Sequence, residues 1–347
     1  MIARRRFLAG FGPALLLAGG ELKAQEAPAV RVVLDWKYEG EHAQFTVPVT
    51  DGTYGRLGLR VTLDRGNGSG DTVAKVASGA YDMGLADTYT MARFNANNPN
   101  NRLISVAMVQ EASASGVIAL RSKGINNPAD LAGKRVYAPA ADAGRILFPL
   151  FAAQTKIDAN SVQWHTVTSE LRDAMLARRE ADAVTGNIVT TVMNLQAVNV
   201  PESELVTFFY GRYGIELYGS SLVTTRAYAE RNPEVVRKFI LGLVHGLNTM
   251  VENLDTSMAS LKTYDNLLND RIEKERMIIS MRYMLATPNV LKNGFSSVDT
   301  ERLDRTLKQV APAFNIAPPQ VSDVYTDAYL PAPNERTIRP WADPAKR

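Results

Sequence analysis

Short apolar runs alternate with amphipathic stretches along most of this chain. Residues 30–36, 83–86, 103–110 and 117–120 are apolar or β-branched runs with the length of buried strands. Between two of them, residues 72–78 have the spacing of a helix, which Gly79 ends. Strands that alternate with helices predict an α/β architecture.

The alternation continues through the second half and then gives way to helices. The predicted strands there are 136–138, 163–167, 181–187, 205–210 and 220–225, and the predicted helices are 144–154, 171–178 and 235–254. Residues 255–330 are mostly helical in pattern, whereas 331–347 hold four prolines and little apolar periodicity, which predicts a loosely held tail. A chain of this length is too long for one small core and fits two lobes.

Several predicted strands end in polar residues, at the edge where open α/β sheets bind ligands. Trp36 ends the first strand, and the charged stretch after it favours a cleft position over the core. Lys37 either complements a ligand charge or forms a solvated ion pair with Glu39 or Glu41. After the second strand, a glycine-rich loop with Asn67, Gly68 and Ser69 opens the next helix, where backbone can approach a ligand.

Two further strand ends carry candidate contacts. Asp87 follows the strand at 83–86, where it either caps the next helix or contacts the ligand. The junction from Pro139 to Gly144 joins a strand to a helix, so Ala141, Asp142 and Gly144 can present backbone N–H groups to a polar ligand. An ordinary βα loop has the same composition, and the junction alone does not separate the two interpretations.

The stretch around that junction resembles a known family. Residues 122–136, with the pattern S-K-G-I-x-x-P-x-D-L-x-G-K-R-V, are similar to the crossover segment of periplasmic substrate-binding proteins of the nitrate, sulfonate, taurine and thiamine-pyrimidine group. Other stretches match in the same order: L-D-W at 34–36, V-A-S-G-x-x-D-x-G-x-x-D at 76–87 and D-A-V-x-G at 182–186. The resemblance covers most of residues 30–250.

This resemblance implies a two-lobed periplasmic-binding-protein fold of type II, with mixed sheets, helices on both faces and two hinge crossings. Lobe I would comprise residues 30–114 and 220–330, and lobe II residues 115–219. The hinges would lie near Ser113–Gly116 and Tyr213–Gly219, which adds Ser113, Tyr213 and Tyr218 to the candidate ligand contacts, although packing at a lobe junction explains the two tyrosines equally well. Asn187 ends another strand and completes the set.

The N-terminal residues 1–24 have the pattern of an export signal. Three arginines at 4–6 precede a short apolar run that is too short to span a bilayer comfortably. The head resembles a twin-arginine signal, although general secretion accepts it as well. Without these residues the chain has 35 basic and 35 acidic residues, so its charge does not indicate a nucleic-acid partner. We therefore expect a periplasmic protein with its signal removed.

The composition also limits the chemistry. The chain has no cysteine, and its three histidines have no ligand spacing, so we expect no thiol catalysis, no metal and no cofactor. The resemblance implies a monomeric, non-enzymatic solute-binding component that works with an inner-membrane ABC permease. Its ligand would be a sulfonate, a nitrate-like anion, or an aromatic or pyrimidine compound, although residues 37–40 depart from the proline–asparagine pattern of pyrimidine binders. The alternatives are a pyrimidine-synthase-like enzyme on the same fold, or a periplasmic ligand sensor.

Overall fold

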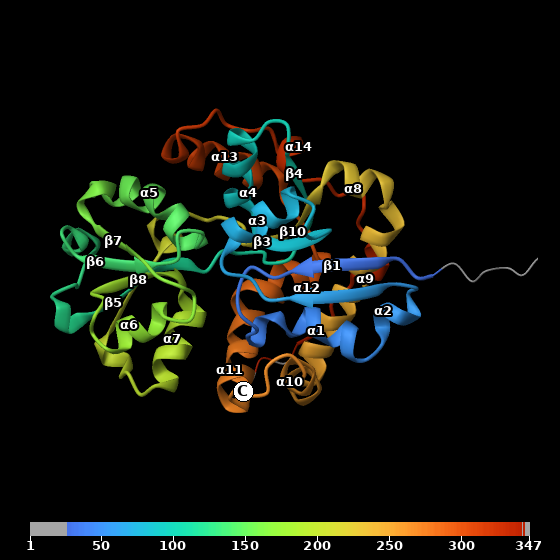
Figure 1. Ribbon diagram of the computed structural model, residues 1–347, viewed down its shortest axis with the longest axis horizontal. Coiled ribbons are helices and arrows are strands. Elements are labelled where there is room, and N and C mark those ends of the chain that lie inside the picture. The colour runs from blue at the N-terminus through green and yellow to red at the C-terminus, as the bar shows by residue number, and fades with distance from the viewer. Residues whose placement is uncertain (1–25, 342, 344–347) are drawn as a thin grey trace, which may run out of the picture.

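The computed structural model describes residues 26–341 and 343, which form two lobes side by side (Figure 1). Each lobe is built on a five-stranded mixed sheet with helices packed around it. The predicted α/β architecture with mixed sheets is therefore confirmed. The predicted export signal, residues 1–24, lies outside the described residues.

The sheet of lobe I has the order β2-β1-β3-β10-β4. Its strands are β1 Ala29–Val33, β2 Arg60–Asp64, β3 Met83–Asp87, β4 Leu103–Met108 and β10 Ser220–Thr225. Strand β10 runs antiparallel to both of its neighbours, and the other pairs are parallel. Strands β3 and β4 are buried at every position, as strands covered on both faces should be.

The sheet of lobe II repeats this arrangement with the order β7-β6-β8-β5-β9. Its strands are β5 Ser115–Leu120, β6 Arg135–Ala138, β7 Gln163–Thr166, β8 Ala183–Asn187 and β9 Leu205–Phe209. Here β5 is the strand that runs antiparallel to both neighbours. Thus in each lobe the antiparallel strand is the first one that the chain forms after it crosses from the other lobe.

This reversal determines which residues meet at the cleft. Ser115, the first residue of β5, pairs in register with Asn187, the last residue of β8. Ser220, the first residue of β10, pairs in the same way with Asp87, the last residue of β3. The amino ends of the two antiparallel strands therefore lie at the carboxyl ends of the parallel strands, where this sheet type binds ligands.

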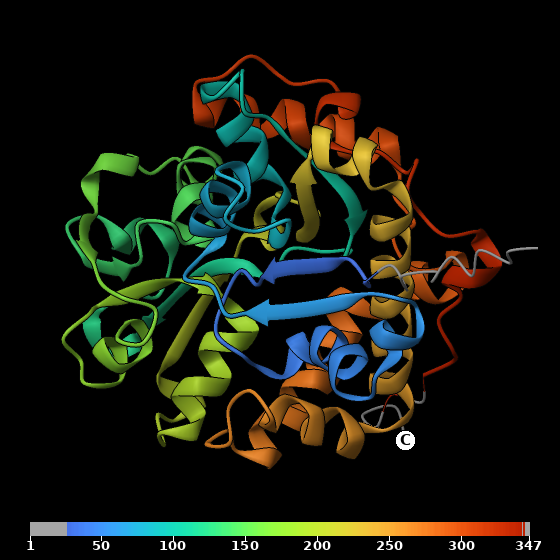
Figure 2. The ribbon, with the colours of Figure 1, turned by 45° about the vertical axis from the view of Figure 1, so that its right-hand side comes forward.

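The helices flank both sheets. In lobe I they are α1 Ala43–Thr50, α2 Thr53–Arg56, α3 Ser69–Ala77, α4 Thr88–Asn97, α8 Arg226–Arg231, α9 Pro233–Glu252, α10 Leu254–Lys262, α11 Asp270–Ser280, α12 Pro288–Asn293, α13 Thr300–Phe314 and α14 Val321–Val324. In lobe II they are α5 Ala143–Thr155, α6 Arg172–Ala177 and α7 Ile188–Ala197. The long helix α9 packs against α1 beside the strands β1 and β2 (Figure 2). Helices α11 and α13 reach lobe II and pack against α7 and α5.

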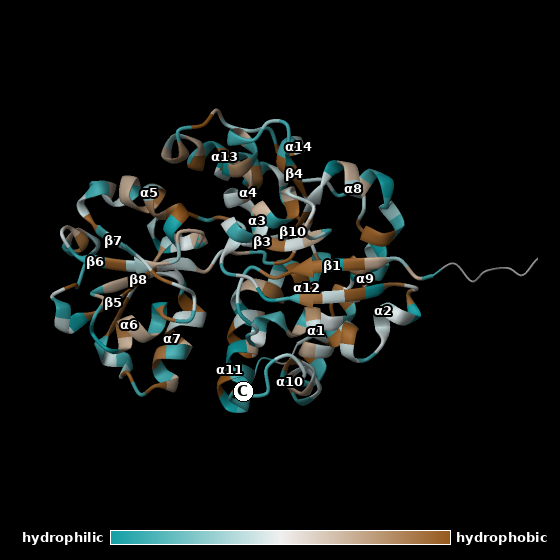
Figure 3. Ribbon diagram, viewed as in Figure 1, coloured by the Kyte–Doolittle hydropathy of each residue, from teal (hydrophilic) through white to brown (hydrophobic). Residues whose placement is uncertain are grey.

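The core lies between these helices and the sheets. Figure 3 shows the apolar positions concentrated in the strands, with polar positions on the outer faces of the helices. Val32 of β1, Leu85 of β3 and Phe239 of α9 are almost fully buried in lobe I, and Val136 of β6 and Phe151 of α5 are buried in lobe II. No helix among residues 26–341 is long and apolar enough to cross a membrane.

The C-terminal segment differs from the loosely held tail that its prolines predicted. Ile338 is 2% exposed within the core of lobe I, and the N–H of Phe295 donates to the carbonyl of Arg336 at 2.8 Å. Asp343 forms an ion pair with Arg282. Single contacts at separate positions hold this segment against lobe I. Contacts of this kind produce no repeating apolar pattern, so the sequence did not indicate them.

The sheets divide the chain close to the predicted lobe boundaries, with residues 109–114 and 214–219 as the connecting segments. Residues 40–56 form a 3₁₀ turn followed by the two short helices α1 and α2. Gly52 between the two helices has φ +78°, a left-handed conformation that interrupts the helix.

Candidate functional site

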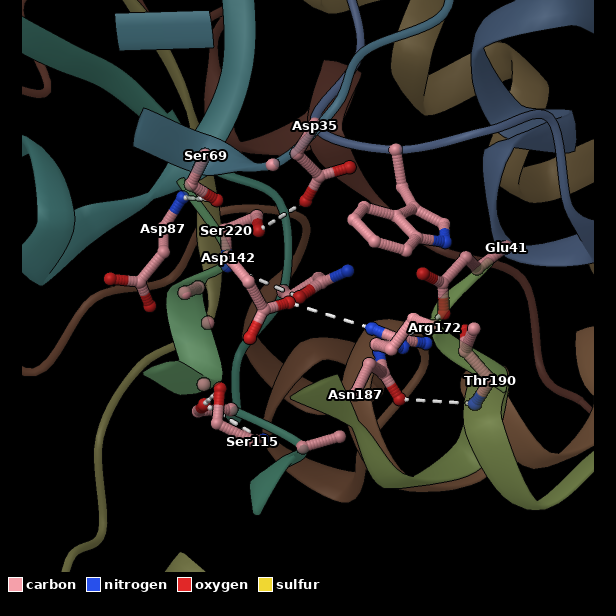
Figure 4. A pocket seen from close by; sticks show the side chains of 18 residues that line it. Asp35, Glu41, Ser69, Asp87, Ser115, Asp142, Arg172, Asn187, Thr190 and Ser220 are labelled. Atoms are coloured by element: carbon pink, nitrogen blue, oxygen red, sulfur yellow. Dashed lines mark hydrogen bonds and ion pairs between the residues drawn. The ribbon is translucent and has the colours of Figure 1, made fainter. Parts of the chain in front are cut away.

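A polar cavity lies between the lobes, at the strand ends described above (Figure 4). The volume within which the centre of a water molecule can lie is about 60 Å³. On the same measure, one water needs roughly 10–15 Å³. The cavity is therefore large enough for a small solute. It is lined by Asp35, Trp36, Glu41, Gly68, Ser69, Asp87, Gln110, Ser113, Ala114, Ser115, Asp142, Ala143, Gly144, Arg172, Asn187, Thr190, Gly219 and Ser220.

Lobe I contributes a hydrogen-bonded wall. Ser220 Oγ donates to Asp35 Oδ2 at 2.8 Å, which ties the start of β10 to the residue after β1. Ser69 Oγ, at the start of α3, accepts the backbone N–H of Asp87 at 2.9 Å. Three strand ends and one helix start are thereby fixed around one side of the cavity.

Asp87 serves as the N-cap of α4. Its Oδ1 accepts the backbone N–H groups of Tyr89 and Thr90 at 3.1 and 2.7 Å. Burial raises the pKa of this carboxyl to about 6, although the two backbone hydrogen bonds act against the rise. The sequence left open whether Asp87 caps the helix or faces the ligand site, and the structure shows that it caps α4 and also lines the cavity.

Lobe II presents the equivalent strand ends. Asp142, after β6, caps α5 by accepting the backbone N–H of Arg145 at 2.9 Å, and it also accepts the hydroxyl of Thr185 at 3.1 Å. Asn187, the last residue of β8, caps α7 by accepting the N–H of Thr190. In both lobes, therefore, a residue at the carboxyl end of a strand caps the next helix and lines the cavity.

Arg172 of α6 is the buried cation of the site, with 1% of its surface exposed. Its Nε donates to Asp173 at 2.7 Å, and its Nη1 lies 3.5 Å from Asp142. Nη2 donates to the hydroxyl of Thr191 at 2.8 Å. A Cβ at Gly186 would lie 2.2 Å from Nη1, so the glycine that ends the D-A-V-x-G stretch leaves the space that this guanidinium occupies.

A cluster of acidic groups surrounds His42 beside the cavity. His42 is fully buried, and its Nε2 lies 3.2 Å from Asp35 and 4.0 Å from Glu41. Burial lowers the pKa of His42, but the hydrogen bond and the charge of Asp35 outweigh burial and raise it. Burial raises the pKa of Glu41 to about 7, which makes this carboxyl titratable near neutral pH.

The seam between the lobes is closed by direct contacts beside the cavity. Glu39 accepts the hydroxyl of Thr190 at 2.8 Å and lies 3.6 Å from Arg276 of α11. Arg276 also donates to the carbonyl of Thr190 at 3.0 Å. On the other side, the N–H of Gly70 donates to the carbonyl of Ala141 at 3.0 Å.

Most of the residues predicted as ligand contacts meet at this cavity. Those that line it are Trp36, Gly68, Ser69, Asp87, Ser113, Asp142, Gly144 and Asn187. Trp36 is 8% exposed, and Arg172 lies 4.6 Å from its ring centroid, so one face of the indole is already covered. Trp36 was predicted to face the cleft and not the core. Its ring lines the cavity, and it is also buried by the facing lobe.

Three predicted polar or small contacts lie beside the cavity without lining it. Lys37 lines a separate depression at the outer end of the seam. Asn67 is exposed and accepts the hydroxyl of Ser169 across the seam at 3.3 Å. Ala141 faces Gly68 and Gly70, where its carbonyl joins the lobes. Asn67 and Ala141 therefore contact the opposite lobe, whereas Lys37 lies 5.9 Å from the ring centroid of Trp36 in its own lobe.

The two predicted tyrosines lie in the packing at the lobe junction. Tyr213 packs edge-on against Phe151 in lobe II, with ring centroids 5.1 Å apart. Tyr218 is 1% exposed, its hydroxyl accepts the N–H of Asp299, and Arg302 lies over its ring. Neither lines the cavity, and the packing interpretation is right for both, because apolar neighbours on α5 and α13 cover them.

Several cavity residues were not predicted from the sequence. They are Asp35, Glu41, Gln110, Ala114, Ser115, Ala143, Arg172, Thr190, Gly219 and Ser220. Ser115 and Ser220 had a recognisable signal, since each begins a strand directly after a predicted crossing. Arg172 had none, because the pattern of residues 171–178 predicted a helix without indicating which of its polar side chains is buried. Among the described residues, no group of three or more His, Asp or Glu side chains is placed to hold a metal ion.

Comparisons with known proteins bear on this site. The profile of the family described as "NMT1/THI5 like" matches residues 39–257. A formylaminopyrimidine-binding protein of Halalkalibacterium halodurans is 27% identical over 284 residues, which is 80% of this chain and 83% of that protein.

Two solved structures share the fold. The alkanesulfonate-binding protein SsuA of Xanthomonas axonopodis pv. citri, bound to MOPS, is similar with a TM-score of 0.65 at 13% identity, over 87% of this chain and 99% of that one. The periplasmic nitrate-binding protein NrtA of Synechocystis PCC 6803 gives 0.64 at 10% identity, over 87% and 86%. The predicted periplasmic-binding-protein fold is therefore confirmed.

Proposed function

The chain belongs to the NMT1/THI5-like family, and from that premise we propose that it is the solute-binding component of an ABC importer. Its two lobes would close on a small molecule and present the closed form to a permease in the inner membrane. The relatives with printed ligands are binding proteins for a formylaminopyrimidine, alkanesulfonates and nitrate. These relatives all bind small solutes, which supports a solute-binding role for this chain. Their ligands differ in chemistry, so the ligand of this chain has to be inferred from its own cavity.

One observation carries the proposal: the cavity is assembled from equivalent strand ends of two lobes that are joined by two chain crossings. Asp35 and Asp142 follow equivalent strands, and so do Asp87 and Asn187. Ser220 and Ser115 start the two antiparallel strands. A site divided between two hinged bodies releases its ligand by opening, which is what a carrier requires.

The proposal includes a periplasmic location and a monomeric state. The basic head and short apolar run of residues 1–24 support export with removal of the signal. The family relationship supports a permease partner, and the complete cavity within one chain supports action as a monomer.

Binding without catalysis agrees with the site chemistry. Ser220 donates its hydroxyl to Asp35 and has no imidazole as a base, so its oxygen is not activated as a nucleophile. The pyrimidine-synthase alternative depends on a cysteine-rich motif, and this chain contains no cysteine. A sensor role would use the same cavity, and a receptor gene next to this one, in place of permease and ATPase genes, would favour it.

The proposal is tested by titrating the mature protein with a panel of small solutes in a calorimeter and by recording scattering curves with and without each ligand that binds. We expect one class of solute to bind and to decrease the radius of gyration. A panel that spans anions, cations and neutral heterocycles without any binding would contradict the proposed function.

A further inference from the structure

The charges around the cavity are predominantly negative. Four carboxylates line it, from Asp35, Glu41, Asp87 and Asp142. Arg172 is the one arginine or lysine among the residues that line it, since Lys37 lies at the separate depression along the seam. These carboxylates come from three separate segments of the chain, since Asp35 and Glu41 share the connection after β1. The negative charge is therefore distributed around the cavity and does not belong to one loop.

The guanidinium of Arg172 is already neutralised by the protein. It lies between two carboxylates, Asp173 at 2.7 Å and Asp142 at 3.5 Å, and its remaining nitrogen donates to Thr191. Trp36 covers its face. An anionic ligand would have to displace one of these carboxylates and leave it buried without a partner, which is costly. Arg172 therefore holds the side chains of lobe II in place and is not available to bind an anionic ligand.

The carboxylates of Asp87 and Glu41, by contrast, can accept further hydrogen bonds. Within the described residues, Asp87 accepts hydrogen bonds at Oδ1 alone, and its Oδ2 accepts none. Glu41 accepts at Oε2 from Asn187 and Ser280 over the long distances of 3.5 and 3.3 Å, and its Oε1 lies 4.0 Å from His42, beyond hydrogen-bond distance. A carboxylate has roughly four acceptor positions. Buried carboxylates in this state are stabilised by any ligand that brings positive charge and N–H donors.

We infer that the cavity selects a small organic cation or an amino-bearing solute, whose N–H groups donate to Glu41 and Asp87, and that it excludes sulfonates, carboxylates and nitrate. The inference rests on the proposed function and narrows it to one chemical class. It also excludes two of the ligand classes that the family resemblance implied, the sulfonates and the nitrate-like anions, and retains the amino-substituted heterocycles. The small volume of the cavity favours compact members of this class.

The test uses pairs of probes that match in shape and differ in charge. Guanidinium and nitrate are both planar and trigonal, and benzamidine and benzoate share one ring. The mature protein is titrated with each probe in a calorimeter at pH 8, where the pKa values of about 6 for Asp87 and about 7 for Glu41 leave both carboxyls largely ionised. We expect the cation of each pair to bind at least tenfold more tightly than the anion. An anion that binds as tightly as its cationic partner overturns the inference.

Charge-removing variants identify the carboxylates responsible. Asp87→Asn keeps the acceptor that caps α4 and removes the charge. Glu41→Gln likewise removes a charge and keeps a side-chain acceptor, at another point on the lobe I side of the cavity. We expect each to weaken cation binding at least tenfold. Glu180→Gln, at an exposed position in lobe II, is the matched control and should change nothing. Unchanged cation binding in both cavity variants would overturn the inference.

The two proposals fail in different ways. A sulfonate or nitrate that binds and closes the lobes leaves the transport function standing and overturns the charge selection. A protein that binds no probe, and no member of the wider solute panel, contradicts the proposed function, and the charge selection falls with it.

Discussion

The guanidinium of Arg172, in lobe II, lies 4.6 Å from the ring centroid of Trp36, in lobe I. This contact joins the lobes across the cavity and pairs a buried cation with an aromatic face. It also accounts for the burial of Trp36, because the second lobe covers a ring that would otherwise face the open cleft. The side chain of Arg172 thus neutralises two carboxylates of the site and holds the two lobes together.

Replacement of Arg172 should destabilise the protein strongly. Arg172→Met leaves Asp142 and Asp173 buried without their cation, so we expect a loss of about 3–5 kcal/mol in the free energy of unfolding. Urea denaturation measures this loss. Arg178→Met, at an exposed position just after the same helix, is the control and should fall within about 0.5 kcal/mol of the wild type. Equal stability of the two variants would show that the buried pairing contributes little.

Two substitutions at Trp36 should have different effects. The Nε1 group of Trp36 is buried and donates to no acceptor within the described chain, so Trp36→Phe removes an unsatisfied donor and should cost little beyond its smaller ring area. Trp36→Ala should cost about 3–5 kcal/mol because it leaves a cavity beneath Arg172. Thermal melts and ligand titration measure both effects. Similar losses for the two variants would contradict this distinction.

The closed form should depend on the contact between Glu39 and Thr190. Thr190→Val removes the hydroxyl that donates to Glu39 at 2.8 Å, and a lost hydrogen bond to a buried charged group costs about 1.5–3 kcal/mol. Because Glu39 and Thr190 lie on different lobes, we expect the loss to favour opening. Small-angle scattering of the ligand-free variant should give a larger radius of gyration. Thr207→Val, in the same lobe and without a side-chain hydrogen bond, should leave the curve unchanged.

Stability without ligand should fall as the pH rises from 4 to 7. The pKa of Asp87 rises from 3.8 in a free side chain to about 6 in the fold, and that of Glu41 from 4.5 to about 7. The unfolded chain therefore loses these protons at lower pH than the folded chain, and each ionisation in the fold costs on the order of 3 kcal/mol. The raised pKa of His42 acts in the same direction.

Denaturation measured at several pH values tests this dependence. Asp87→Asn should flatten the part of the curve between pH 4 and 6, and a cationic ligand should restore stability at pH 8. A free energy of unfolding that increases steadily over this range would contradict the assignment of raised pKa values.

The exported protein should lack its N-terminal basic head. Intact mass measurement of the protein from the periplasmic fraction should show removal of at least residues 1–20. Retention of Met1 in that fraction would contradict the predicted signal.

The sequence was informative at the carboxyl ends of the parallel strands. Asp87 and Asn187 are the last residues of their strands, and Trp36 and Asp142 lie shortly after theirs. These strand ends meet at one edge of the sheet whatever the details of packing. The same logic extends to Ser115 and Ser220 once the two crossings are recognised, because a reversed strand brings its first residue to that edge.

Other parts of the site depend on how the lobes pack, which local pattern does not encode. Arg172 and Thr190 lie on helices of lobe II, and their role follows from contacts with Trp36 and Glu39 of lobe I. Tyr213 and Tyr218 were chosen for their aromatic character near a hinge, yet both pack against apolar residues from distant segments, which bury Tyr218 fully and Tyr213 in part. For the same reason the path of residues 331–341 along lobe I was not predictable, since isolated anchors such as Ile338 hold it.

Close packing at Gly68 limits which substitutions the seam between the lobes can tolerate. A Cβ at this position would lie 2.5 Å from the carbonyl oxygen of Ala141 in the facing lobe. A side chain there would strain the loop, because Gly68 has φ +116°, and it would block the final approach of the two backbones. In the proposed transport role, only the closed form is presented to the permease. A single methyl group at this seam would therefore separate capture of the solute from its delivery.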